Sequence, residues 1–365
     1  MNTSFRLFPE AASHGAVEVD NLTFALLGIA TVFSVGIALT IFFFIARYWH
    51  TRKVNRQSSK SEWVHLSIEL VWSLGPLAIL MFMMAWGAQV YVRAHQPPDN
   101  ALDVYVVAKQ WMWKVGHPAG RREINELHVP LGQPVRLTMI SEDVVHSFFI
   151  PAFRIKQDVV PARYMTLWFE ATKPGTYHLF CAEYCGTDHS RMIGRVVVQT
   201  PQEFSRWLAQ GEAQPPAQGK VDSIAQGEGN PADQSEVESM AERGHKLVDA
   251  MGCMKCHGTL AGEQTAPSLE GLYGARVPLV GGKSALADDA FIRRSLLDPQ
   301  TQIHEGFKQV MPSFAGQLDE EQIMDITAYI RALAQPAEFE NAVELTALNA
   351  PVPSVAVASA AGVDR

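Results

Sequence analysis

Residues 181–192 read CAEYCGTDHSRM, so two cysteines, a histidine and a methionine lie within one short segment. Soft thiolate and thioether ligands favour copper or an iron–sulfur cluster, and imidazole suits copper. Most iron–sulfur clusters need four cysteines. A zinc site of two Cys and two His would leave Met192 unused, and a single blue copper takes only one cysteine. Two thiolates can instead bridge two copper ions, provided that a second histidine comes from elsewhere in the fold.

A second motif lies in residues 252–258, GCMKCHG. Its C-x2-C-H spacing is the one that attaches a c-type haem, with thioether bonds from Cys253 and Cys256 and an axial ligand from His257. A redox dithiol of the thioredoxin type would require a βαβ setting, whereas this segment is predicted to lie among helices. We therefore predict covalent haem here.

The sixth haem ligand must come from further along the chain. Met324 falls inside a predicted helix and is expected to pack against its neighbours. Met311 lies in the predicted loop VMPSFAG, which Pro312 stiffens. We favour Met311, with His304 as the second candidate. A methionine and histidine pair raises the potential of a haem.

Two uncharged runs, residues 22–46 and 70–92, are each long enough to cross a bilayer as a helix. We expect the first to be retained, because a signal peptide has a basic leader and a shorter apolar core. The loop between them contains bases and no acid, which predicts a cytoplasmic loop and extracytoplasmic termini. Its bases are Arg47, Arg52, Lys53, Arg56 and Lys60. Disulfides are the default outside the cytoplasm, but a histidine follows each cysteine pair and favours metal chemistry.

The rest of the chain divides by pattern. Short alternating segments predict an all-β domain at 97–210, which follows an N-terminal segment and anchor at 1–96. We expect a flexible linker at 211–239, a helical domain at 240–335 and a disordered tail at 336–365. The net charge is −8, and no basic surface is evident that would bind nucleic acid. Three histidines without partners at ligand spacing are predicted to be structural: His117, His128 and His178.

The segment DVVHSFFIP lies upstream of CAEYCGTDHSRM, and together they resemble the binuclear copper site of cytochrome c oxidase subunit II. The resemblance covers residues 22–209 in layout. It implies a set of copper ligands: the bridging Cys181 and Cys185, His146 and His189, the weak ligand Met192, and the backbone carbonyl of Glu183. It also implies that the Glu183 side chain reaches a magnesium ion shared with subunit I.

Two further positions match patterns of this family. Trp111, in KQWMWKV, takes the place of the tryptophan that receives electrons from an external cytochrome c. Glu69, Trp72 and Pro76 match the E-x-x-W-x-x-x-P pattern around an acid at the mouth of a proton-uptake path. An acid at the edge of a span is a functional candidate by default, although a solvated helix cap or an ion pair with a nearby lysine is the alternative interpretation.

Residues 240–335 resemble a cytochrome c domain. The expected fold is thus a two-helix transmembrane hairpin, a cupredoxin-like β-sandwich or Greek-key barrel, and an all-α class I cytochrome c domain. The resemblance implies the electron-input subunit of a haem–copper oxidase of the inner cell membrane. Electrons would pass from haem c to copper and then to haem a in subunit I, where oxygen becomes water and protons are translocated. Further oxidase subunits are implied, with a cytochrome c or a quinol–cytochrome c reductase as donor.

Other functions remain as alternatives. A copper-containing nitric-oxide reductase subunit and a membrane-anchored electron carrier would share these motifs. Nitrous-oxide reductase has a similar copper loop, but it needs a propeller domain for which this chain has no room. Quinol oxidase subunits lack the two copper cysteines, which this chain has at Cys181 and Cys185.

Overall fold

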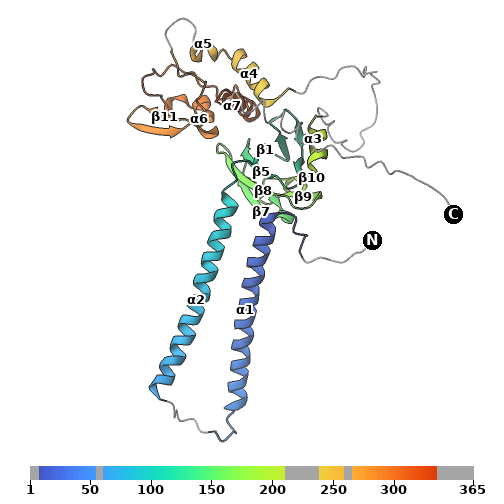
Figure 1. Cartoon of the computed structure of the whole chain (residues 1–365), viewed down its shortest axis with the longest axis vertical. Helices are drawn as coiled ribbons and strands as arrows, with labels where there is room; N and C mark the ends of the chain where they lie inside the picture. The colour runs from blue at the N-terminus through green and yellow to red at the C-terminus, as the bar shows by residue number, and fades with distance from the viewer. Residues whose placement is uncertain (1–7, 55–60, 210–237, 259–264, 335–365) are drawn as a thin grey trace, which may run out of the picture. The chain divides into compact units, whose positions relative to one another are not determined.

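The structure is a computed structural model, and it describes residues 8–54, 61–209, 238–258 and 265–334 (Figure 1). The predicted tail, almost all of the predicted linker, and Arg56 and Lys60 of the basic loop lie outside these residues. The chain separates into two compact units. One contains the apolar helices and the β-domain, and the other contains the C-terminal helices.

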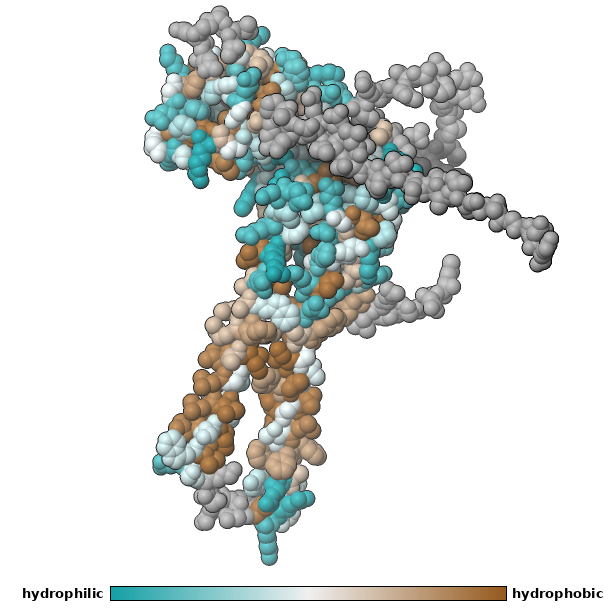
Figure 2. Space-filling view, in the orientation of Figure 1, coloured by the Kyte–Doolittle hydropathy of each residue, from teal (hydrophilic) through white to brown (hydrophobic). Residues whose placement is uncertain are grey.

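The first unit begins with two long helices, α1 (His14–Arg47) and α2 (Glu62–His95). The Ser13 side chain caps α1 by accepting a hydrogen bond from the amide of Ala16 at 3.0 Å. Large apolar side chains are exposed along both helices, which Figure 2 shows in brown. Both helices are long and apolar enough to cross a membrane. Each extends beyond the uncharged run that predicted it, because the polar turns at its ends are also helical.

The β-domain follows α2 and consists of two packed sheets. Its strands are β1 (Leu102–Lys109), β2 (Met112–Gly116), β3 (Arg122–Ile124), β4 (Glu126–Pro130), β5 (Pro134–Ser141), β6 (His146–Ile150), β7 (Ile155–Val159), β8 (Met165–Glu170), β9 (Gly175–Cys181) and β10 (Ile193–Gln199). One sheet has the order β3-β2-β1-β5-β8 and the other β4-β10-β9-β6-β7. The pairs β1–β5 and β4–β10 are parallel, and the other pairs are antiparallel. A short helix, α3 (Pro201–Ala209), ends the domain.

The alternation of side chains along these strands builds the core between the sheets. In β10, every second residue from Gly194 to Val198 is buried, as expected for a half-buried strand. Trp113 and Phe148 are fully buried and pack edge to face with ring centroids 5.0 Å apart. The core reaches the ends of β6 and β9, so the residues at those ends are held on a rigid support.

The second unit is mainly helical. Its elements are α4 (Met240–Ala250), α5 (Met254–His257), β11 (Arg276–Leu279), β12 (Lys283–Leu286), α6 (Asp289–Leu297) and α7 (Glu320–Ala334). Asp319 accepts a hydrogen bond from the Gln322 amide at 2.8 Å, as a helix cap does. The order of helical hairpin, β-sandwich and helical domain is confirmed. The hairpin of β11 and β12 is an addition that the helical prediction did not include.

Helices α4 and α7 cross closely, and a glycine allows it. A Cβ atom on Gly244 would lie 2.0 Å from the carbonyl oxygen of Asp325. Beside it, the Arg243 guanidinium donates two hydrogen bonds of 3.0 Å to the Asp325 carboxylate. This crossing holds α4 in place, and α4 leads directly into the C-x2-C-H motif.

Candidate metal centre and haem pocket

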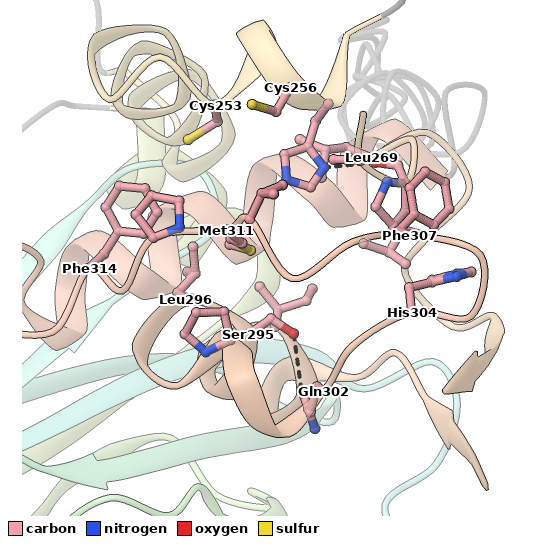
Figure 3. Close-up of a pocket in the computed structure, with 18 of the residues that line it drawn as sticks. Cys253, Cys256, Leu269, Ser295, Leu296, Gln302, His304, Phe307, Met311 and Phe314 are labelled. Atoms are coloured by element: carbon pink, nitrogen blue, oxygen red, sulfur yellow. Dashed lines mark hydrogen bonds between the residues drawn. The ribbon is translucent and has the colours of Figure 1, made fainter. Parts of the chain in front are cut away.

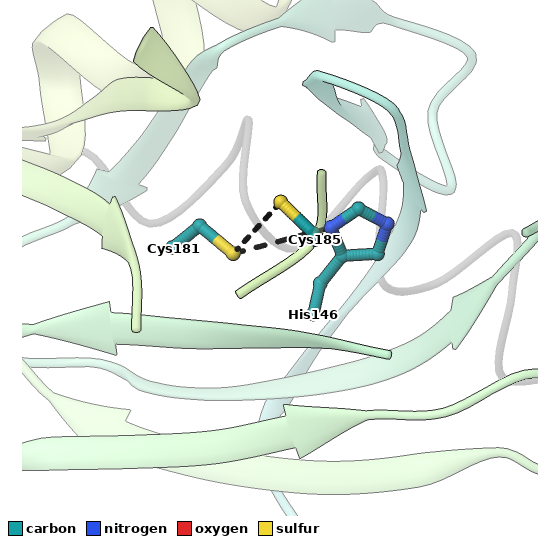
Figure 4. Close-up of side chains that lie close together, drawn as sticks. All are labelled: His146, Cys181 and Cys185. Atoms are coloured by element: carbon teal, nitrogen blue, oxygen red, sulfur yellow. Dashed lines mark hydrogen bonds between the residues drawn. The ribbon is translucent and has the colours of Figure 1, made fainter. Parts of the chain in front are cut away.

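The two cysteines of the β-domain lie side by side at one end of the second sheet. Cys181 is the last residue of β9, and Cys185 lies in the loop between β9 and β10. Their sulfur atoms are 3.7 Å apart. His146, the first residue of β6, places its Nδ1 atom 3.9 Å from the Cys181 sulfur (Figure 4).

The remaining predicted ligands surround the same two sulfur atoms. His189 Nδ1 lies 3.5 Å and Met192 Sδ 3.8 Å from the sulfur of Cys185. The carbonyl oxygen of Glu183 lies 3.2 Å from the sulfur of Cys181. All six predicted residues therefore converge on one cluster, and Met192 is buried there although its neighbour Ile193 is exposed. Two thiols, two imidazoles, a thioether and a carbonyl form a donor set that suits a pair of copper ions.

Residues around the cluster orient one of its histidines. His146 Nε2 lies 2.8 Å from a carboxylate oxygen of Asp143. Asp143 also accepts a hydrogen bond of 2.7 Å from the backbone amide of Gln110. The hydrogen bond between Nε2 and the Asp143 carboxylate turns the ring so that Nδ1 faces the sulfur of Cys181. A hydrogen bond of this kind also fixes which nitrogen of a metal-binding histidine carries the proton. Sequence reasoning missed these roles of Asp143 and Gln110, although the D-x-x-H spacing was a signal for the first.

Trp111 contacts the backbone of the loop between β9 and β10, which contains Cys185. Its Nε1 donates a hydrogen bond of 3.2 Å to the Cys185 carbonyl oxygen, and the Gln110 side chain donates one of 2.8 Å to the same oxygen. Gly186 follows with φ of 116°, and a Cβ there would lie 2.9 Å from the Gln110 amide nitrogen. The positive φ favours glycine here, and the lack of a Cβ leaves room for the Gln110 side chain. The Trp111 indole is thereby joined to a predicted ligand residue through one hydrogen bond.

The protonation of the two thiols is linked. Burial opposes charge on Cys181, but hydrogen bonds from His146 and from backbone amides outweigh it and lower the pKa of Cys181 to about 6. Burial and the adjacent Cys181 sulfur raise the pKa of Cys185 to about 12. Two neighbouring thiols resist double ionisation because the second negative charge is repelled by the first. A bound cation would remove this penalty, since metal-coordinated thiols are deprotonated.

The second unit contains a large cavity with mainly apolar walls, drawn in Figure 3. Cys253, Cys256 and His257 line it, as does Met311. Further lining residues are apolar: Met251, Leu269, Leu272, Phe291, Leu296, Phe314, Ile326 and Ile330. His257 Nδ1 lies 2.7 Å from the carbonyl oxygen of Pro267, which leaves its other nitrogen for a ligand. An apolar cavity with two thiols and a fixed imidazole fits a covalently bound haem.

The candidates for the sixth haem ligand differ in position. In Figure 3, Met311 projects toward the centre of the cavity, whereas the ring of His304 is directed outward at its edge. Met324 is buried in α7 and is not part of the lining. Of the three candidates, Met311 is the one whose side chain both lines the cavity and points into it.

The other singled-out residues lie away from these two sites. Glu69 is exposed on α2. His117 and His128, which were predicted to be structural or surface residues, both contact the buried carboxylate of Glu123, at 3.0 and 2.5 Å. This Glu123 network is structural, because it ties β2, β3 and β4 together. His178 stacks on the ring of Phe180.

These features define a class of protein: a membrane-anchored electron-transfer protein with a β-sandwich metal centre and a cytochrome c domain. A family profile described as "Cytochrome C oxidase subunit II, periplasmic domain" matches residues 81–200. The transmembrane domain of the same family matches residues 2–90, and "Cytochrome c" matches residues 241–334. The chain belongs to the cytochrome c oxidase subunit II family and also carries a cytochrome c domain.

The chain is similar to individual proteins of known name. The cytochrome c oxidase subunit 2 of Thermostichus vulcanus is 29% identical over 260 residues, which cover 57% of this chain and 79% of that protein. That of Alkalihalophilus pseudofirmus is 26% identical over 330 residues, 86% of each chain. The solved periplasmic domain of cytochrome oxidase subunit II from Bradyrhizobium japonicum is 31% identical, with a TM-score of 0.30. It matches 31% of this chain and 94% of that one.

Proposed function

We propose that this chain is the electron-input subunit of a haem–copper oxidase and passes electrons from its own haem c to a binuclear copper centre. The family and the membrane anchor support this function. The observation that supports the copper assignment is a cluster of six donor residues. The sulfur atoms of its two cysteines lie 3.7 Å apart, and the other four donors surround them. When bound, the haem and the copper pair would supply one-electron carriers.

Each residue of the cluster has its own proposed role in binding copper. Cys181 and Cys185 would hold both ions through their sulfur atoms, and His146 and His189 would each supply a nitrogen ligand. Met192 is a weak ligand, and the Glu183 carbonyl completes the set. Asp143 holds His146 with Nδ1 facing the cluster. In the second unit, Cys253 and Cys256 would attach the haem, and His257 and Met311 would supply the ligands of its iron.

Trp111 is the residue through which electrons reach the copper cluster, a role supported by its hydrogen bond to the Cys185 carbonyl. Glu69 serves proton uptake at the cytoplasmic edge of α2. The side chain of Glu183 would bind a magnesium ion together with subunit I. Among the residues that the structure describes, neither the Glu69 nor the Glu183 carboxylate forms a hydrogen bond or ion pair, and the proposal assigns their partners to the neighbouring subunit.

The basic loop between α1 and α2 lies in the cytoplasm, and both metal-binding domains face the periplasm or its equivalent. Subunit I contacts the exposed apolar faces of the two helices and receives the electrons. A soluble cytochrome c or a quinol–cytochrome c reductase supplies electrons to the haem. Reduction of oxygen to water takes place on subunit I and not on this chain.

Metal analysis of the purified oxidase complex tests the copper assignment. We expect two coppers assigned to this chain and, after oxidation, a seven-line hyperfine pattern from one unpaired electron shared by both. Cys185→Ser is expected to abolish this pattern and leave the haem c spectrum unchanged. A single copper, or zinc in its place, would refute the proposal.

A further inference from the structure

Arg154 has a backbone conformation that is unusual for its residue type. It follows the short 3-10 turn η1 (Pro151–Phe153) and has φ of 55° and ψ of 33°. This left-handed region favours glycine, because a Cβ atom is crowded there. A non-glycine residue keeps this conformation only when contacts around it hold it there, and the Arg154 side chain makes such contacts.

The Arg154 side chain joins three segments of the first unit. Its guanidinium donates two hydrogen bonds, of 2.9 and 3.0 Å, to the two carboxylate oxygens of Asp20 in α1. It also donates to the carbonyl oxygens of Pro151 at 2.7 Å and Pro9 at 2.8 Å. The Arg154 side chain is 13% exposed. A two-pronged, largely buried contact of this kind is both strong and directional.

Backbone hydrogen bonds reinforce this contact. The Ala12 amide donates to the Ala152 carbonyl oxygen at 3.0 Å, and the Thr172 amide donates to the Ala12 carbonyl oxygen at 2.9 Å. The Ser13 hydroxyl donates to the Phe153 carbonyl oxygen at 3.1 Å. The segment that leads into α1 is therefore bonded to the β-sandwich on both sides. We call the contacts of residues 9–20 with residues 151–154 and 172 the clamp.

The clamp lies at one end of β6, and the predicted copper ligand His146 lies at the other. The turn η1 follows directly on β6, and Phe153 is fully buried in the sandwich core. A second link ties the sandwich to α2, where the Trp168 indole donates to the Arg93 carbonyl oxygen at 3.0 Å. Strand β6 thus connects the cluster to the part of the clamp formed by residues 151–154.

We propose that Asp20 and Arg154 are positioning residues that hold the copper centre at a fixed place above the membrane helices. This inference rests on the proposed function. Electron tunnelling weakens steeply as the distance between centres grows, so a centre that moves relative to the membrane delivers electrons to subunit I more slowly. Neither residue touches a copper ligand, and their effect on transfer comes only through the placement of the sandwich.

The test uses the assembled oxidase complex with Asp20→Asn and Arg154→Gly. The glycine variant relieves the strained backbone while it removes the contacts that the Arg154 side chain makes in the clamp, so a purely conformational role predicts no loss. We expect hydrogen exchange at the Ala12 and Thr172 amides to accelerate at least tenfold in both variants. We also expect transfer from copper to haem a, followed after flash reduction, to slow several-fold with an unchanged copper hyperfine pattern.

Asp103→Asn is the matched control. Asp103 accepts two hydrogen bonds, of 2.5 and 2.8 Å, from Arg136, and both residues lie within the sandwich. Its loss is expected to leave both measurements unchanged. Arg154→Lys keeps the positive charge but loses the forked guanidinium. We expect it to slow electron transfer by an intermediate amount. It replaces Asp20→Asn if that variant does not assemble.

Unchanged exchange, unchanged transfer, or equal slowing in the control would overturn the positioning role. The absence of the binuclear copper pattern in the unmodified complex would instead contradict the proposed function.

Discussion

Two cysteine pairs in this chain have similar spacing but different surroundings, and the surroundings decide their chemistry. Cys181 and Cys185 are buried beside two imidazoles and a thioether. Cys253 and Cys256 line an apolar cavity beside one imidazole. The first setting suits metal bridging, and the second suits attachment of a large apolar group. Residue type alone would not separate the two.

Met311 is expected to bind the haem iron through its sulfur. Met311→Ala should abolish the weak long-wavelength band that arises from sulfur-to-iron charge transfer, because no thioether would then reach the iron. Absorption spectra of the oxidised protein measure this. Met324→Ala is the matched control: it removes a buried methionine of α7 and should lower stability but retain the band. Loss of the band in the control alone would transfer the role to Met324.

Glu123 is expected to stabilise the β-domain in a pH-dependent way. Burial opposes its charge, but hydrogen bonds with His117 and His128 outweigh this and lower the pKa of Glu123 to about 2, from an ordinary value of 4.5. A depressed folded-state pKa stabilises the domain above about pH 4.5, and this contribution is lost as the pH falls toward 2.

Glu123→Gln should therefore lower the free energy of unfolding by on the order of 2–3 kcal/mol at pH 7, and by less at pH 3. Denaturant titration of the parent and the variant at both pH values measures the difference. Glu126→Gln, which removes a more exposed carboxylate paired with Arg195, serves as control. An equal loss at both pH values would contradict the linkage.

At the scale of elements, the crossing of α4 and α7 and the ends of β6 and β9 position the two sites. The crossing of α4 and α7 depends on Gly244, where an added methyl group would collide with the Asp325 carbonyl. We expect Gly244→Ala to destabilise the haem domain by roughly 1–3 kcal/mol or more, as overpacking does. Denaturation followed by haem absorbance measures this. Lys246→Ala, at an exposed site on the same helix, should change stability by less than about 0.5 kcal/mol.

Helix α2 places Glu69 two turns from its start, where it is exposed. Glu69→Gln is expected to lower steady-state oxygen consumption several-fold and to leave haem c reduction unchanged, because proton uptake would be impaired and electron input would not. Glu62→Gln, in the first turn of the same helix, is the control. Undiminished turnover in Glu69→Gln from about pH 6 to 9 would leave Glu69 without a role in proton uptake.

At the scale of the whole molecule, the two metal-binding domains belong to one chain. The composition of residues 211–239 predicts a linker, and a flexible linker of that length has an r.m.s. span of roughly 30 Å and gives an effective concentration on the order of millimolar. Acids and bases nearly balance in residues 97–200, and residues 240–335 have a modest excess of acids. Strong charge pairing between the domains is therefore not expected.

We expect transfer from haem c to copper to depend little on ionic strength, because the tether and not charge attraction sets the encounter. Flash-reduction rates at about 20 mM and about 300 mM salt measure this; over that range the Debye length shortens from well above to below about 10 Å. A tenfold fall with salt would show that electrostatic docking controls the step.

The sequence by itself determined everything that depends on local spacing. The apolar runs determined the membrane helices, because a span needs only length and the absence of charge. The C-x2-C-H motif indicated haem because the two attaching cysteines and the histidine ligand lie within five consecutive residues. The thiols, imidazole and thioether of residues 181–192 indicated copper for the same reason. The residues alone left the second histidine open, and only the family resemblance pointed to His146.

The tertiary structure decided what depends on contacts between distant segments. It placed His146 beside Cys181 because β6 and β9 are neighbours in one sheet, and it directed Nδ1 inward because Asp143 engages the other nitrogen. It also paired Glu123 with two histidines and Arg154 with Asp20. Strand order and register arise from packing of the whole core, so the local pattern of a single chain does not specify which distant side chains meet.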